Sequence, residues 1–295
     1  MESIIAHQKA WIKEQNKHCS YDYLDNYQDN LFMTLDGEDL DNFKNGSGNE
    51  LEDKNGEKAK MKALISSSAL CVNFFLYLKQ KGLLTSFLGL IGIHNVSVLK
   101  GEFEKKLKTG ASSAKANLDF FIDCSNCVIG IESKFTEHYD KNHGPLKQSY
   151  LEKKNNWQLK EKFSNTFSNL AKWINCNWTL GEYSDKKTGK TYKGRFSPFK
   201  YLDVAQLIKH LFALDNDVDV KKPYILLYIH YDILCNEINE HEDEIRKFRS
   251  ILKKDKVYFI SVSYQSIFDK LSKYLKKDVK GHEDYLTYMK SRYLL

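Results

Sequence analysis

Three side chains in residues 117–137 have the types and the spacing of a hydrolytic metal site. The segment NLDFFIDCSNCVIGIESKFTE carries Asp119 on one apolar run, and Glu132 and Lys134 on the next. Alternate side chains of a strand share one face, so Glu132 and Lys134 are expected side by side, with apolar neighbours on the opposite face. A carboxylate and an ammonium beside an apolar strand are costly unless they pair or bind something. The segment therefore predicts a functional site.

Polar turn residues between the two runs predict an antiparallel hairpin that places Asp119 across from Glu132. Mg²⁺ takes oxygen ligands, usually one or two carboxylates completed by waters and phosphate oxygens. The predicted metal ligands are Asp119, Glu132 and the backbone carbonyl of Ser133. Lys134 can orient or help deprotonate a water and can balance charge in the transition state. The chemistry predicted is metal-assisted phosphodiester hydrolysis with Mg²⁺, for which Mn²⁺ can substitute.

The pattern of Asp119 followed by Glu132-Ser-Lys134 resembles the PD-(D/E)xK restriction-endonuclease-like nucleases, although Leu118 stands where the family name has a proline. The resemblance implies an α/β fold with an αβββαβ core, a mixed central sheet flanked by helices, and extra helical segments. It also implies a Mg²⁺-dependent DNA endonuclease of restriction type that acts on double-stranded DNA. Cutting both strands with one site per chain favours a homodimer, and a monomer that nicks twice is the alternative.

The order of expected elements agrees with this core without use of the motif. Hydrophobic periodicity and turn residues predict a helix, three strands, a helix and a strand, followed by one further strand and helix, at 66–82, 96–110, 118–122, 128–135, 201–214, 222–232, 256–264 and 265–275. Residues 1–60 are expected to form an N-terminal extension, a polar helix followed by a mobile loop. Residues 61–295 are then the nuclease domain.

Three acids are candidates for an auxiliary role. In the resembling family a helix before the sheet often carries an extra glutamate, and Glu50 or Glu57 could supply it; solvated loop acids are the alternative for both. Glu104, on the first strand, could approach the metal from the neighbouring strand. An exposed ion pair with Lys106 is its alternative.

The helix at 201–214 carries Gln206 and His210 one turn apart, and the resembling family can place a Gln or Lys beside the metal from this helix. An ordinary pair on the helix surface is the alternative. His138 and His143, in EHYDKNHG, could be metal ligands together with Glu137 and Asp140. A solvated loop is the favoured interpretation, because a hard Mg²⁺ site prefers carboxylates to imidazole.

The segment 182–200 predicts an inserted basic hairpin or loop in which aromatic side chains alternate with cations. Such a segment can contact phosphates through its cations and bases through its aromatic rings. A solvated hairpin with ordinary lysines is the alternative. The candidate nucleic-acid contacts are Lys186, Lys187, Lys190, Lys193 and Arg195.

Composition bounds the remaining possibilities. The chain has 295 residues, 42% of them hydrophobic, and a formal charge of +6, which is compatible with a polyanionic partner but does not demand one. No run is apolar enough for a membrane span or a signal peptide, so a cytoplasmic location without membrane contact is expected. Six scattered cysteines indicate reduced thiols. Cys124 and Cys127 form a C-x-x-C pair, but no second pair stands at zinc-finger spacing.

The leading hypothesis is therefore a Mg²⁺-dependent DNA endonuclease. Two alternatives stay open: a module that keeps the nuclease fold and binds DNA without chemistry, and a nuclease of DNA repair or recombination. A zinc or thiol protein centred on the C-x-x-C pair is the least favoured hypothesis.

Overall fold

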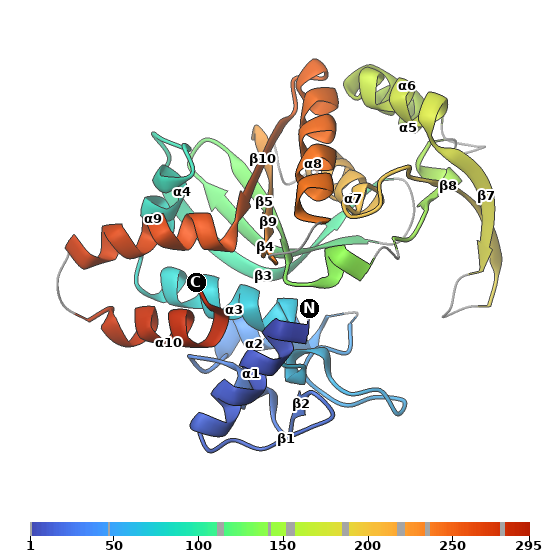
Figure 1. Ribbon diagram of the computed structural model, residues 1–295. Helices are drawn as coiled ribbons and strands as arrows, with labels where there is room; N and C mark the ends of the chain where they lie inside the picture. The colour runs from blue at the N-terminus through green and yellow to red at the C-terminus, as the bar shows by residue number, and fades with distance from the viewer. Residues whose placement is uncertain are drawn as a thin grey trace.

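The computed structural model describes residues 2–46, 48–110, 115–140, 143–151, 157–184, 189–216, 222–233, 237–277 and 281–295 (Figure 1). Its centre is a mixed five-stranded sheet in the order β10-β9-β5-β4-β3. β10, β9 and β5 are parallel, whereas β5, β4 and β3 form an antiparallel meander. The predicted meander and the two later strands are confirmed, with bounds β3 Val98–Lys108, β4 Lys115–Cys124, β5 Val128–Lys134, β9 Tyr224–His230 and β10 Tyr258–Ser263.

Helices cover both faces of this sheet, which gives an α/β architecture with two buried apolar clusters. One face carries α1 (Glu2–Glu14), α2 (Gly37–Lys44), α3 (Ser67–Gln80), α4 (Leu84–Leu90), α9 (Tyr264–Lys277) and α10 (Glu283–Tyr293). The other carries α5 (Trp157–Thr166), α6 (Ser168–Asn177), α7 (Val204–Asn216) and α8 (Glu237–Lys254). Figure 1 shows α3 and α10 on the side of the sheet away from α7 and α8.

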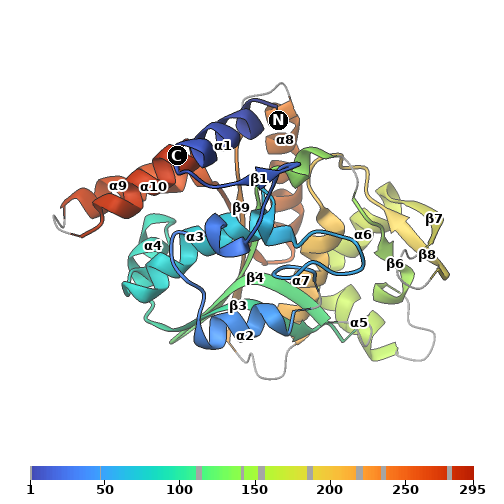
Figure 2. The same ribbon diagram turned by 90° about the horizontal axis from the view of Figure 1, so that it is seen from below.

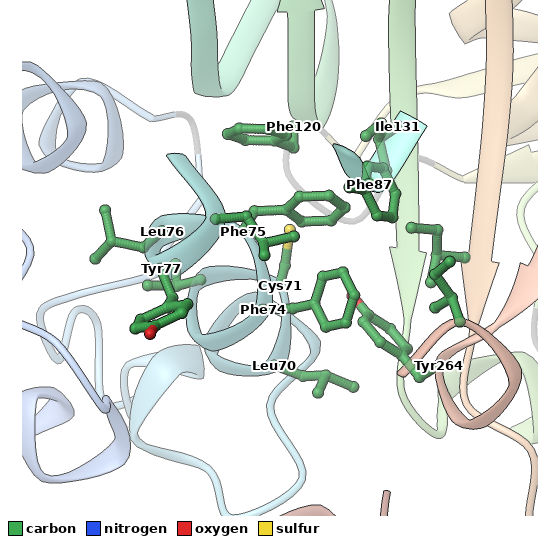
Figure 3. Packing of buried hydrophobic residues seen from close by; sticks show 14 of the residues in the cluster. Leu70, Cys71, Phe74, Phe75, Leu76, Tyr77, Phe87, Phe120, Ile131 and Tyr264 are labelled. Carbon is green, nitrogen blue, oxygen red and sulfur yellow. The ribbon is translucent and has the colours of Figure 1, made fainter. Parts of the chain in front are cut away.

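The helix α3 anchors the first cluster. The Ser66 hydroxyl accepts a hydrogen bond from the backbone N–H of Ala69, as predicted for a serine N-cap. Phe75 then stacks on Phe120 of β4, with 4.7 Å between ring centroids, and Tyr264 packs edge-on to Phe74 (Figure 3). These contacts fix the face of the sheet opposite the charged residues of β5.

A second, three-stranded sheet lies at one side of the molecule. Its antiparallel strands run in the order β6-β8-β7, and β7 and β8 form the hairpin predicted around 182–200 (Figures 1 and 2). Lys186 and Lys187 lie outside the described residues. The bounds are β6 Leu146–Lys147, β7 Thr179–Ser184 and β8 Thr191–Phe196.

The N-terminal segment packs on the same core. α1 lies against α10, so the two ends of the chain are close together (Figure 2). The stretch expected as a mobile loop contains α2, whose Phe43 is buried and packs on Phe103 of β3 with ring centroids 5.8 Å apart. Its short elements are β1 Cys19–Ser20, β2 Tyr23–Leu24, η1 Tyr27–Asn30 and η2 Lys60–Lys62, with η3 Glu137–Asp140 and η4 Gln148–Tyr150 later in the chain. Within the described ranges, every helix is too short or too polar to cross a bilayer.

Candidate active site

The β4–β5 hairpin brings the predicted acids to one place. Phe120 pairs with Ile131, so Asp119 and Glu132 are the next residues on facing strands. Ile131 packs in the cluster on the α3 side, whereas Glu132 contacts His210 on α7, on the opposite side of the sheet. The predicted alternation of faces along β5 is therefore confirmed.

Glu132 is buried, with 1% of its surface exposed. Its Oε1 lies 2.6 Å from the Nζ of Lys134, and its Oε2 lies 2.7 Å from the Nε2 of His210. Burial alone would raise the pKa of this carboxyl, but the neighbouring Lys134 and His210 outweigh burial and hold the pKa at about 2. Glu132 is therefore a carboxylate with both oxygens engaged.

Lys134 is held on two sides. Its Nζ donates a hydrogen bond of 2.9 Å to the Oε1 of Gln206, besides contacting Glu132. The carboxylate of Asp203 accepts from the backbone N–H of Gln206, in the manner of an N-cap, and so fixes the first turn of α7. Burial would lower the pKa of Lys134, but Glu132 and Asp119 raise it, so the side chain stays an ammonium.

The alternative that Gln206 and His210 form an ordinary pair on the helix surface is therefore wrong. Both project from α7 onto the charged residues of β5, and His210 is 2% exposed. The spacing of one helical turn could have indicated a shared target, because such residues lie on one face. What the spacing could not reveal is that α7 packs over β5.

Asp119 lies beside the backbone that follows Glu132. Its Oδ2 accepts a hydrogen bond of 2.7 Å from the backbone N–H of Ser133, the residue whose carbonyl was predicted as a metal ligand. Burial and the neighbouring charge of Glu132 raise the pKa of Asp119 well above its usual value. A cation at this position would relieve that repulsion.

Glu104 lies opposite Asp119, between the pairs Phe103–Phe120 and Lys105–Leu118. It has a left-handed backbone conformation, with φ of 52°, which interrupts the alternation of β3 and leaves both Phe103 and Glu104 buried. The expected exposed pair with Lys106 is wrong, because Lys106 donates instead to the backbone carbonyl of Asn45.

The surroundings of Glu104 disfavour its charge. Its carboxylate accepts from the side-chain amide of Asn117. Burial is the main reason that its pKa is raised to about 7, and the nearby carboxylates of Glu50 and Glu132 contribute. Glu104 therefore belongs electrostatically with the acids of β4 and β5.

Glu50 reaches the same region from the N-terminal segment. It is 7% exposed, and its carboxylate contacts the Nζ of Lys60 at 2.8 Å and accepts from the Ser68 hydroxyl at 2.6 Å. The alternative of a solvated loop acid is therefore wrong for Glu50, whereas Glu57 is exposed as that alternative expected. Burial would lower the pKa of Lys60, but Glu50 and, more weakly, Glu104 and Asp119 raise it.

The carboxylate cluster, defined as Glu50, Glu104, Asp119 and Glu132, contains more acidic groups than neighbouring ammonium groups. If all four carboxylates were ionised, the ammonium groups of Lys60 and Lys134 would balance only two of the charges, and the raised pKa values of Asp119 and Glu104 reflect this crowding of like charge and their burial. One divalent cation would balance the other two charges, and hard oxygen donors are the ligands that Mg²⁺ prefers. The donor set therefore fits Mg²⁺ in charge and in ligand type.

Among the described residues, the cations predicted to contact nucleic acid lie apart from this cluster, on the second sheet (Figure 1). Lys190 and Lys193 are exposed on the β7–β8 hairpin, whereas Arg195 is half-buried on β8 where it pairs with Leu146. The Nζ of Lys147, on β6, lies 4.8 Å from the ring centroid of Tyr192. The hairpin thus combines exposed cations with an aromatic ring at its surface.

The structure also places the C-x-x-C pair and His138, which was expected in a solvated loop. Cys124 and Cys127 are free, buried thiols at the β4–β5 turn, and burial raises the pKa of Cys124 to about 12. His138 does not lie in a solvated loop, because it is 1% exposed and contacts His241, with ring centroids 4.5 Å apart. Sequence spacing gave no signal for this contact between residues about a hundred positions apart.

A family model described as "Restriction Endonuclease associating with ARP", REase-ARP, matches residues 2–294. The chain belongs to this family. Membership in REase-ARP agrees with the restriction-endonuclease-like resemblance of the Asp119, Glu132 and Lys134 pattern. No curated protein and no solved structure shows a significant match to this REase-ARP chain.

Proposed function

We propose that this chain is a Mg²⁺-dependent DNA endonuclease of the PD-(D/E)xK type. The observation that carries the proposal is that Asp119, Glu132 and Lys134 meet on β4 and β5, in a carboxylate cluster whose crowded charge raises the pKa of Asp119. Membership in a restriction-endonuclease family supports it. The family description also leads us to propose that the chain acts in association with ARP.

In the proposed reaction Asp119, Glu132 and the Ser133 carbonyl hold the metal ion. The ion would supply Lewis-acid stabilisation of the phosphate and a more acidic bound water. Lys134, kept as an ammonium, stabilises negative charge that develops on the phosphate in the transition state. Glu104 and Glu50 lie near these residues. Their carboxyl groups add negative potential that favours the binding of a divalent cation.

Gln206 and His210 are positioning residues, because they contact Lys134 and Glu132 and not the proposed metal ion or the substrate. Gln206 accepts from Lys134 and limits where its ammonium can point. His210 holds one oxygen of Glu132, so that the other stays directed toward Lys134. We expect His210→Ala to reduce cleavage strongly while DNA binding persists, since His210 lies on the buried side of Glu132.

The second sheet is the proposed contact for DNA. Lys190, Lys193 and Arg195, with Lys186 and Lys187 outside the described residues, are proposed to contact backbone phosphates. Such contacts position the duplex and do not specify a sequence. A formal charge of +6 is compatible with this partner.

The test is cleavage of supercoiled plasmid by the purified full chain. Mg²⁺ or Mn²⁺ should support nicking or linearisation, EDTA should abolish it, and Asp119→Asn, Glu132→Gln and Lys134→Ala should each remove it. Asp123→Asn is the matched control, because it changes an acid of β4 that pairs with Lys222 away from the cluster. If all three site variants cut as well as the control, the proposal is wrong.

The alternative of a DNA-binding module without chemistry has one observation in its favour. Both oxygens of Glu132 already contact protein groups, since Oε2 is hydrogen-bonded to His210 and Oε1 is in an ion pair with Lys134. This alternative predicts salt-sensitive DNA binding that needs no metal and survives Glu132→Gln. Calorimetric titration of the DNA complex with Mg²⁺ separates the two: heat that disappears in Asp119→Asn supports the nuclease.

A further inference from the structure

Three buried imidazoles meet beyond the end of β5, outside the carboxylate cluster. His138 lies in η3 directly after β5, His230 is the last residue of β9, and His241 lies near the start of α8. They are 1%, 5% and 0% exposed. A ring nitrogen of each lies within 4.8 Å of the other two, and in the described part of the chain no other three metal-binding side chains come this close.

The outer nitrogens of two of these rings face polar groups. The Nδ1 of His230 lies 3.0 Å from the carboxylate of Asp232, an ion-pair distance without a hydrogen bond, and the Nε2 of His241 lies 3.2 Å from the Tyr228 hydroxyl. Metal-binding histidines commonly hold a carboxylate or another polar group with the second ring nitrogen, which fixes the ring. Asp232 is fixed in turn, since its backbone N–H and C=O both bond to the side chain of Gln265.

The inner nitrogens lack such partners. The Nδ1 of His241 and both ring nitrogens of His138 are buried without a hydrogen-bond partner among the described residues. Buried polar atoms are nearly always paired, so three unpaired imidazole nitrogens in contact call for a ligand. Burial, followed by the neighbouring imidazoles, lowers the pKa of His138 well below its usual value and that of His241 to about 3. The rings of His138 and His241 are therefore neutral, the form that offers lone pairs to a metal.

We propose that His138, His230 and His241 together bind one transition-metal ion of the zinc class. Imidazole suits zinc, copper, iron and nickel, whereas Mg²⁺ prefers oxygen ligands, so this site is chemically distinct from the carboxylate cluster. His230 would bind through Nε2 and His241 through Nδ1. Zn–N bonds of about 2.0–2.1 Å require the three nitrogens to draw together from separations of up to 4.8 Å. A water molecule completes the coordination.

Such an ion would connect three elements, η3, β9 and α8, near the C-terminal end of β5. η3 follows β5 after Thr136, His230 is the register partner of Lys134, and α8 covers the end of β9. The backbone N–H of Tyr231 also donates to the Lys134 carbonyl. The metal would therefore act as a structural clamp on the segment that carries Lys134.

The experiment uses the untagged full chain, since a polyhistidine tag would bind the same metals. Protein purified without chelator should contain about one equivalent of zinc-class metal per chain by elemental analysis. After removal of the metal, titration with Co²⁺ should give visible absorption bands of low-symmetry cobalt that saturate at one equivalent. A tenfold or larger loss of cobalt affinity is expected for His138→Asn and for His241→Asn. His94→Asn, at an exposed histidine, is the matched control and should bind as the wild type does.

Two further variants and a melting measurement distinguish this site from the proposed nuclease site and from a loss of folding. Asp232→Asn removes only the outer partner of His230 and should weaken cobalt binding by about 10–100-fold. Asp119→Asn should retain full cobalt binding, which separates this site from the proposed nuclease site. Addition of Zn²⁺ should raise the melting temperature of the wild type and of His94→Asn but not that of His241→Asn. Folded metal-free wild type that takes up neither Co²⁺ nor Zn²⁺ would overturn the proposal, and so would His138→Asn and His241→Asn proteins that bind cobalt as tightly as the control.

Discussion

Replacing Glu104 by Gln should stabilise the metal-free protein above neutral pH. Glu104 is buried beside other carboxylates, and its pKa is raised from 4.5 to about 7. Because the folded carboxyl holds its proton to higher pH than the unfolded one, the free energy of unfolding falls as the pH rises from about 4.5 to about 7. Gln keeps the shape of the side chain and can still accept from Asn117, but it has no charge to develop.

The size of the effect follows from the two pKa values. One pKa unit corresponds to about 1.4 kcal/mol, so the rise in the pKa of Glu104 from 4.5 to about 7 corresponds to a loss of about 3 kcal/mol in the free energy of unfolding. Glu104→Gln should therefore match the wild type near pH 4.5 and exceed it by up to about 3 kcal/mol at pH 8. Adding Mg²⁺ at pH 8 should stabilise the wild type more than the variant, because a bound cation relieves the repulsion.

The assay is urea unfolding in EDTA at several pH values, followed by circular dichroism. Glu102→Gln is the matched control on the same strand; it loses ion pairs with Lys105 and Lys100 and should lower stability at neutral pH by up to about 1 kcal/mol. A difference between Glu104→Gln and the wild type that stays flat from pH 4.5 to pH 8 would refute the electrostatic account of the carboxylate cluster.

Three other predictions concern packing and DNA. Gly130→Ala should cost about 1–3 kcal/mol in urea unfolding, because a Cβ would lie 2.9 Å from the Leu214 Cδ1; an unchanged midpoint would mean that α7 packs more loosely on β5. Phe75→Ala should cost about 3–5 kcal/mol, since the ring is fully buried in a stack of aromatic rings; a loss under about 1 kcal/mol would contradict its place in the core. Lys193→Ala should reduce the slope of log affinity against log salt by about 0.9 if this cation contacts a phosphate, whereas the exposed Lys276→Ala on α9 should leave the slope unchanged.

The elements of the sheet could be predicted because their signals are local. The segment around Glu132 is rich in β-branched residues and has its charges at alternate positions, which indicates a central strand with two different faces. Ser66 and the apolar spacing of 66–82 likewise predicted α3. The polar turn residues between the two strands predicted the hairpin that places Asp119 opposite Glu132, from local sequence alone.

The rest of the site depends on contacts that spacing does not encode. Glu104 turns inward because its backbone is left-handed, a conformation uncommon for a residue other than glycine and invisible in the pattern of β3. His210 reaches Glu132 only because α7 packs over β5. The imidazole cluster joins His138 to two histidines about a hundred residues later, so the local sequence suggested a solvated loop instead.

The topology of the sheet also orders the assembly of the site in time. The β4–β5 hairpin needs only nearby residues, whereas β9 joins β5 after a loop of about ninety residues has closed, and α7 precedes it in the chain. Local contacts form before distant ones, because closing a long loop costs entropy first. A nascent chain that has not yet emerged past residue 216 would therefore expose Glu132 and Lys134 without His210. We expect the contacts of Glu132 and Lys134 with α7 to form only late in synthesis.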